Sequence, residues 1–171
     1  MARPSLITQY LSVPLPSKSQ QRRLPFRPET WEVDALYRSI NRNIFDNQLT
    51  MPDIELGVIK KAWGLCSWEE TRQRRSSWGK GGTWCTMRLS DKWFCSQWFV
   101  NILAHEMAHQ YQWDIYRWDH QIEHGKAMHT DSFGHGPSFF MWRDRFAEHG
   151  LDLKTSFGKK RWFKHQDFRK C

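Results

Sequence analysis

The sequence KWFCSQWFVNILAHEMAHQYQW, residues 92 to 113, decides the fold of this chain. It contains no Gly or Pro, and apolar residues recur along it at the three- and four-residue spacing of a helix with a buried face. We therefore predict a central helix here. The helix carries the pattern H-E-x-x-H at His105, Glu106 and His109, whose spacing of four places both imidazoles on one face, one turn apart.

These two imidazoles can share one metal ion, and we predict a single zinc ion. Such polar side chains would be costly to bury among apolar residues without a metal. Glu106 lies about 100° around the helix axis from His105, so it reaches the open side of the ion without being a ligand. This placement suits a general base that activates a zinc-bound water for hydrolysis.

A catalytic zinc site needs a third protein ligand and keeps its fourth position for water. The metzincin pattern is excluded, because Gln112 and Ile115 occupy the positions where it requires Gly and His. We favour His135, because its flanking glycines let the backbone bring the imidazole close to a metal just before another helix. The other downstream candidates are His120, His124, His129, Glu123 and Glu148.

The remaining pattern predicts an α+β fold. Thr30 can cap a helix that runs to about Asn47, and Pro137 suits the first turn of a helix that runs to His149. Between them, β-prone pieces at about 54 to 60, 62 to 68 and 83 to 89 predict a small antiparallel sheet. We divide the chain into a flexible, extended Pro-rich arm (1–28), a globular domain (29–150) and a basic tail (151–171).

The chain of 171 residues carries 26 Lys and Arg against 18 Asp and Glu, a formal net charge of +8. This excess favours polyanionic partners such as nucleic acid. The Gly-rich segment between the last two predicted strands is a basic hairpin tip with an exposed aromatic residue. We predict that it contacts DNA, including single-stranded DNA by base stacking, through Arg72, Arg74, Arg75, Trp78 and Lys80. The alternative is a solvated charged loop without a ligand.

The four cysteines form no C-x-x-C pair and no regular spacing, so neither a zinc ribbon nor a disulfide framework is indicated. The N-terminal residues lack the continuous apolar segment of a signal peptide, and no apolar run approaches membrane-spanning length. We therefore expect an intracellular protein that is neither secreted nor embedded in a membrane. The sequence leaves the oligomeric state open.

Two quoted motifs together resemble the SprT-like (Spartan) metalloprotease family. They are His105-Glu-Met-Ala-His109-Gln-Tyr and Gly134-His-Gly-Pro-x-Phe139, and the resemblance extends over roughly residues 31 to 150. It implies a minimal zincin fold in which His105, His109 and His135 hold zinc and Glu106 is catalytic. It also implies a substrate protein attached to DNA or bound on it, so that the activity would serve repair of DNA–protein crosslinks.

Two departures from the family's pattern matter. The segment between His109 and His135 is longer than the resemblance leads us to expect, which indicates an insertion at about residues 113 to 130 beside the site. The C-terminal zinc ribbon of some members is missing. Two alternatives stay open: a DNA-binding or interaction module with structural zinc and closed coordination, and a zinc protease that acts without DNA.

Overall fold

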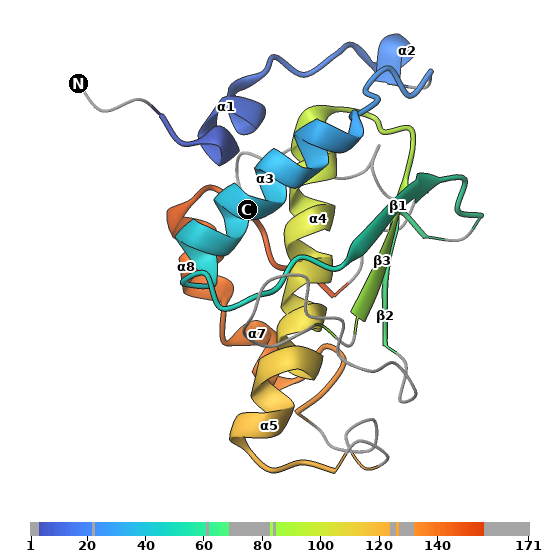
Figure 1. Ribbon diagram of the computed structural model, residues 1–171. Coiled ribbons are helices and arrows are strands. Elements are labelled where there is room, and N and C mark those ends of the chain that lie inside the picture. Colours follow the sequence, from blue (N-terminus) through green and yellow to red (C-terminus); the bar gives the residue numbers. More distant parts are fainter. Residues whose placement is uncertain are drawn as a thin grey trace.

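The computed structural model describes residues 4–21, 23–60, 62–68, 83, 85–123, 126 and 132–155. These residues form an α+β fold, which confirms the predicted fold class. Figure 1 shows α4 running through the middle of the molecule, with the sheet on one side and α3 and α8 on the other. The helices are α1 (Leu6–Ser12), α2 (Lys18–Gln21), α3 (Thr30–Ile44), α4 (Ser96–Tyr111), the π-helical turn η1 (Gln112–Tyr116), α5 (Arg117–Asp119), α7 (Pro137–Phe140) and α8 (Arg143–Glu148).

The sheet contains β1 (Asp53–Gly57), β2 (Gly64–Trp68) and β3 (Cys85–Ser90) in the order β1-β3-β2. The strands match the predicted pieces, but the sheet is mixed, and the prediction of an antiparallel sheet is wrong. β2 pairs antiparallel with β3, whereas β1 pairs parallel with it. β1 and β2 run in opposite directions, as predicted for consecutive strands, but they are not neighbours, because β3 lies between them. A strand flanked by two neighbours of opposite direction must be parallel to one of them.

Helix α3 begins with a reciprocal capping box. The side chain of Glu29 accepts from the backbone at Glu32, and the Glu32 carboxylate accepts from the Glu29 N–H at 2.8 Å. Glu29 is therefore the cap, one residue before the predicted Thr30. The buried stripe of α3 is the one that the spacing predicts: Val33, Leu36, Tyr37, Ile40 and Ile44.

Helix α4 is buried on nearly all sides, because elements pack against it from several directions. It begins at Ser96 rather than near Lys92. At its other end the backbone continues as η1 and α5 to Asp119. The first residues of the predicted insertion therefore extend the central helix, and Trp113 and Asp114 are buried there. Whether residues 113–130 are an insertion stays a prediction, as does the division into arm, domain and tail.

The extended conformation that we predicted for residues 1 to 28 is wrong for residues 6–12 and 18–21, which form α1 and α2. Helix α1 packs against α3 and α4. Ile7 is fully buried in the core. The Ser96 hydroxyl donates to the Tyr10 carbonyl at 2.9 Å, and Gln97 donates to the Leu11 carbonyl at 3.3 Å. Prolines flank this short helix in the sequence. Its apolar side chains are buried against a helix that is distant in sequence.

The single helix predicted from Pro137 to His149 is divided into α7 and α8 by a turn at Met141 and Trp142. Gly150 follows α8 with φ +72°, the left-handed conformation that favours glycine at the end of a helix. None of the helices in the described ranges combines the length and the apolar character needed to cross a membrane.

Candidate metal centre

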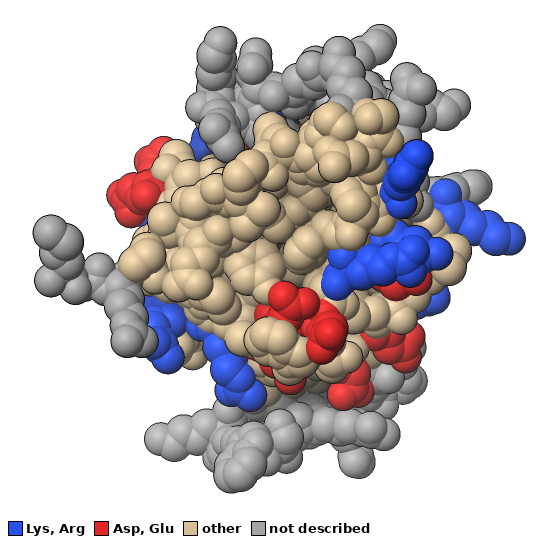
Figure 2. Space-filling view, turned by 90° about the horizontal axis from the view of Figure 1, so that it is seen from above, with Lys and Arg blue, Asp and Glu red and all other residues tan. Residues whose placement is uncertain are grey.

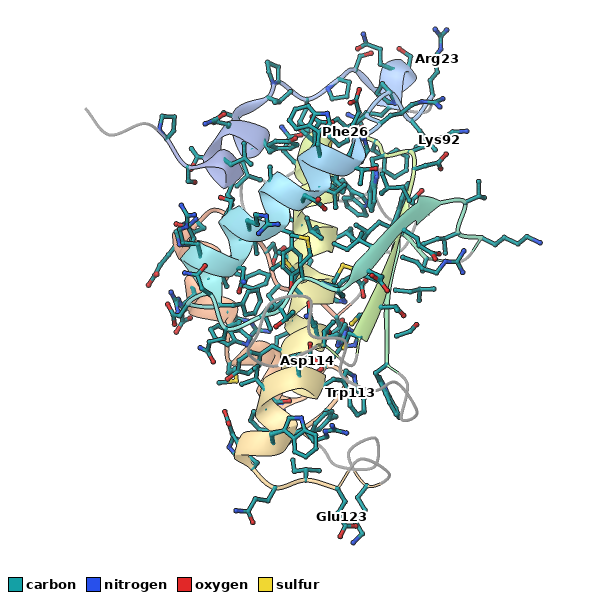
Figure 3. All side chains as sticks on the ribbon, viewed as in Figure 1. Arg23, Phe26, Lys92, Trp113, Asp114 and Glu123 are labelled. Carbon is teal, nitrogen blue, oxygen red and sulfur yellow. The ribbon has the colours of Figure 1, made fainter. Side chains whose placement is uncertain are left out.

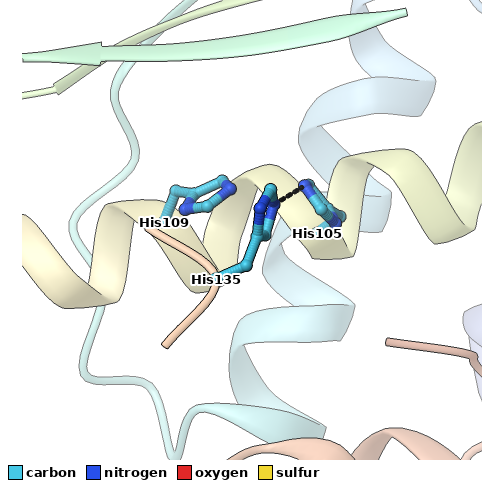
Figure 4. Close-up of side chains that lie close together, drawn as sticks. All are labelled: His105, His109 and His135. Carbon is cyan, nitrogen blue, oxygen red and sulfur yellow. Dashed lines mark hydrogen bonds between the residues drawn. The ribbon is translucent and has the colours of Figure 1, made fainter. Parts of the chain in front are cut away.

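Three imidazoles meet at the C-terminal half of α4. His105 and His109 lie one turn apart on that helix, and His135 comes from the segment before α7. Each offers a ring nitrogen, and these atoms all lie within 4.8 Å of one another. The Nε2 atoms of His105 and His135 are 3.3 Å apart. Figure 4 shows the three rings turned toward one another, with His135 between the two helix histidines.

Phe139 supports all three rings from one side. It is fully buried, and its ring centroid lies 4.9 Å from that of His105, 4.6 Å from that of His109 and 4.9 Å from that of His135. Phe139 belongs to α7, two residues after Pro137. The side chain of Phe139 therefore packs against all three histidines, although they come from two separate segments of the chain.

The environment favours neutral imidazoles, the form that binds metals. Burial, together with the two neighbouring histidines, holds the pKa of His105 well below its usual range, although a hydrogen bond to the Lys154 backbone opposes this. Burial lowers the pKa of His109 to about 4, although the hydrogen bond between its Nδ1 and the Gln112 amide oxygen opposes this. Burial also lowers the pKa of His135. Three converging neutral imidazoles are a donor set that fits zinc.

Glu106 lies beside the histidines and points at β2. Its Oε2 accepts a hydrogen bond from the Cys66 backbone N–H at 2.8 Å. Burial raises the pKa of Glu106 to about 7, while the Cys66 N–H lowers it. A cation held by the adjacent histidines would lower that pKa further.

The close approach of β2 to α4 depends on Gly64. A Cβ at this position would lie 2.8 Å from Cγ and Oε1 of Glu106 and 2.9 Å from Cγ2 of Ile102. A side chain there would therefore displace the carboxylate or push the strand away from the helix. Glycine fits because it has no side chain, and no special backbone dihedral is involved.

A pocket of about 400 Å³ opens over this arrangement. Glu106 and two of the histidines lie on one wall. Other parts of its lining are aromatic, and the Trp113 ring stacks on Trp68 with centroids 4.1 Å apart and contacts Phe133 at 4.9 Å. The lining residues are Gly64, Leu65, Cys66, His105, Glu106, His109, Gln112, Trp113, Phe133 and Gly134.

Of the candidate third ligands in the described residues, only His135 lies close enough to His105 and His109 to share a metal ion with them. The His120 Nδ1 contacts the Tyr116 carbonyl at 3.0 Å, and Glu123 forms an exposed ion pair with Lys126. Figure 3 places Glu123 at the end of the molecule, beyond Trp113 and Asp114. Glu148 is exposed at the end of α8. His124 and His129 lie outside the described residues. Within the described part of the chain, no other group of three His, Cys, Asp or Glu residues is close enough to hold a metal.

A buried polar network behind the site was not predicted. Asp114 of η1 accepts from the Thr83 hydroxyl at 2.7 Å and from the Gln110 amide at 2.9 Å. Gln110 in turn accepts from the Tyr37 hydroxyl at 2.8 Å, which links α3 to α4. The spacing of Gln110 and Asp114, one helical turn apart, was visible in the sequence. The pairing with Thr83 depends on tertiary contacts.

The predicted nucleic-acid residues Arg72, Arg74, Arg75, Trp78 and Lys80 lie outside the described residues. The described cations are dispersed. Figure 2 shows Lys and Arg side chains in separate groups around one face, with carboxylates near some of them. Several described cations have acidic partners, such as Arg88 with Glu55 at 3.6 Å. The DNA contact predicted from sequence is therefore untested.

The fold and the site together define a zincin-like domain: a small sheet packed on a helix that carries two histidines and a glutamate, with a third histidine from a later segment. The sequence model of the SprT-like family matches residues 33–157, and the chain belongs to this family. This confirms the resemblance noted in the sequence. Comparisons with curated proteins and with solved structures gave no match.

Proposed function

We propose that this protein is a zinc-dependent endopeptidase of the SprT-like type. One zinc ion would be held by His105, His109 and His135, and Glu106 would be the general base. One observation carries this proposal: three imidazole nitrogens converge within 4.8 Å, and a buried carboxylate lies beside them on the wall of one pocket. Family membership supports the same reaction class.

The residues of the chain have separate tasks in this mechanism. A bound zinc ion would supply Lewis-acid chemistry, polarising the peptide carbonyl and acidifying the attacking water. Glu106 takes the proton from that water and delivers it to the leaving amine. The Cys66 N–H holds the carboxylate at the site between these two transfers. The aromatic wall of Trp113 and Phe133 excludes solvent from one side of the pocket.

We further propose that the substrate is protein associated with DNA, including protein crosslinked to it. The net charge of +8 supports this, since it attracts the chain to polyanions. The basic hairpin tip at residues 70–82 and the basic tail are the segments we assign to DNA. This part of the proposal rests on the sequence and on the family resemblance.

The decisive experiment compares the wild type with Glu106→Gln on a basic DNA-binding protein, with and without DNA and zinc. We expect zinc-dependent cleavage that DNA stimulates, and a loss of roughly 100- to 10,000-fold in the variant, the usual contribution of a general base. Zinc content should be equal in both proteins, because Glu106 is not a ligand. Equal, background-level cleavage by both proteins would remove the enzyme proposal. Cleavage without any DNA effect would leave a zinc protease that acts on free proteins.

A further inference from the structure

Gln112 is a fully buried amide at the start of η1, three residues after His109. Its Oε1 lies 3.0 Å from Nδ1 of His109. Its Nε2 donates to the Ser138 hydroxyl at 2.8 Å and to the Ser132 carbonyl at 3.3 Å. The Ser138 hydroxyl donates to the same carbonyl. One side chain therefore joins the second histidine of the helix to the segment that carries the third.

The neighbours of Gln112 fix which way its amide points. The Ser132 carbonyl can only accept a hydrogen bond, so the amide NH₂ group must face it. The amide oxygen then faces His109, and an oxygen can only accept. Nδ1 of His109 must therefore carry the proton, and the lone pair is left on Nε2. That tautomer gives Nε2 the free electron pair that a metal ligand requires.

We infer that Gln112 is a positioning residue for metal binding: it sets the tautomer of His109 and ties that imidazole to the His135 segment. The inference rests on the proposed metal site. Gln112 itself makes no bond to the metal. It acts through His109, as partners of ligating histidines generally do. It also acts through Ser132 and Ser138, which lie on either side of His135, so it constrains two of the three ligands together.

The tautomer can be tested in the metal-free protein, without any measurement of activity. Nitrogen NMR of the wild-type imidazoles should show His109 protonated at Nδ1 and unprotonated at Nε2. Finding the proton on Nε2 in the wild type would overturn the inference, whatever any variant does. This result would leave the proposed protease function intact, so the two failures can be distinguished.

The variant Gln112→Leu removes both the acceptor and the donor from the buried site. We expect the Nδ1 preference of His109 to be lost and zinc affinity to fall by about 10- to 100-fold, measured by competition with a chromophoric chelator. Replacing zinc by cobalt in the same protein should give a changed visible absorption spectrum, because the ligand geometry loosens. An unchanged zinc affinity in the folded variant would contradict the inference.

Two further variants separate positioning from packing. Gln110→Leu is the matched control: Gln110 is also fully buried, but its amide bonds Tyr37, Thr50 and Asp114, not a histidine. It should keep zinc affinity within a few-fold of the wild type. Gln112→Glu keeps an acceptor for the His109 proton but, when ionised, has no donor for the Ser132 carbonyl. It should therefore restore the Nδ1 tautomer of His109 and only part of the zinc affinity that Gln112→Leu loses. Equal zinc losses in Gln110→Leu and Gln112→Leu would show that only packing is at work.

Discussion

The two sides of the metal centre are held by different means. On the β2 side the backbone places Glu106: the Cys66 N–H binds its carboxylate, and Gly64 leaves room for it. On the other side, side chains place the histidines, through the bonds of Gln112 and Ser138. The position of Glu106, the group proposed for proton transfer, is thus set by the backbone of an edge strand. The positions of two proposed ligands, His109 and His135, are set by a small hydrogen-bond network of side chains.

This difference has a consequence for how each side tolerates change. Almost any substitution retains the backbone amide. On the β2 side, the size of a new side chain should therefore matter, whereas its functional group should not. A side-chain network is lost with one functional group, so the other side is sensitive to chemistry. Substitutions on the β2 side should therefore affect hydrolysis with zinc retained, and substitutions on the other side should affect zinc binding.

Among the substitutions that test this division between the two sides, the largest effect is expected for Gly64→Ala. The new Cβ would lie less than 3 Å from Cγ and Oε1 of Glu106 and from Cγ2 of Ile102. Cγ and Cγ2 lie close to the helix backbone and cannot move away freely, and Oε1 belongs to the carboxylate that the Cys66 N–H holds. We expect a loss of roughly 1–3 kcal/mol in the free energy of unfolding, as for other overpacked sites. Hydrolysis should fall by roughly 100-fold because the carboxylate is displaced. Chemical denaturation and a peptide-cleavage assay measure the two effects.

Gly57→Ala is the control for this substitution. Gly57 ends β1 at the opposite edge of the sheet, and a Cβ there would have nothing within 4 Å. Hydrolysis should stay at the wild-type level. Zinc affinity should be unchanged in both variants. A loss of zinc binding in Gly64→Ala would show that the β2 side also positions the ligands, and the division between the two sides would be wrong.

The sequence predicted the groups that local geometry determines. A spacing of four on a helix sets the relation of His105 to His109 without any tertiary information. The Gly-His-Gly-Pro segment indicated His135 because glycines and a helix start are themselves local features. The strand positions and the buried stripe of α3 follow from periodicity in the same way.

The sequence did not predict what depends on distant contacts. Gly64 is one residue in a short strand, and only the approach of α4 gives it a role. Gln112 served in the sequence only to exclude the metzincin pattern, because its partners Ser132 and Ser138 lie 20 and 26 residues later. Tertiary packing likewise determines that β3 lies between β1 and β2 and that Ile7 is buried against α4.

A smaller effect is expected for Ser138→Ala, on the network side. The substitution removes the acceptor of the Gln112 NH₂ group but leaves the Ser132 carbonyl as its partner. A net cost of about 1 kcal/mol for this hydrogen bond corresponds to about fivefold weaker zinc binding if the cost falls on the metal-bound state. Chelator competition measures it.

The control here is Ser12→Ala in α1, whose hydroxyl also donates to a backbone carbonyl, that of Thr8 at 2.8 Å. It is exposed and lies at the other end of the molecule, so zinc affinity should not change. The Ser138→Ala variant should keep the His109 tautomer, because the Gln112 oxygen is still present. A tautomer change as large as that of Gln112→Leu would mean that the serine, and not the amide, orients the ring.

The smallest effect is expected at an ion pair that belongs to neither side. Arg145 of α8 bonds Asp46, which follows α3, with Nη2 to Oδ1 at 2.8 Å. The hydrogen bonds from this guanidinium lower the pKa of Asp46, and desolvation opposes that shift. Because the folded-state pKa is depressed, the pair stabilises the fold above the ordinary pKa of the carboxyl. That stability is lost as the pH falls through the lowered value.

Asp46→Asn isolates this contribution, since Asn tolerates the left-handed backbone at this position, φ +53°. In denaturant unfolding, the wild type should be slightly more stable than the variant at neutral pH, and the gap should close at strongly acidic pH because the protonated carboxyl is then also neutral. A gap that does not change with pH would show that the ion pair is not its cause. Zinc affinity at neutral pH should be equal in both proteins. If Asp46→Asn instead weakens zinc binding, the geometry of the metal centre depends on the stability of the whole fold. Its two sides would then not be positioned independently of each other.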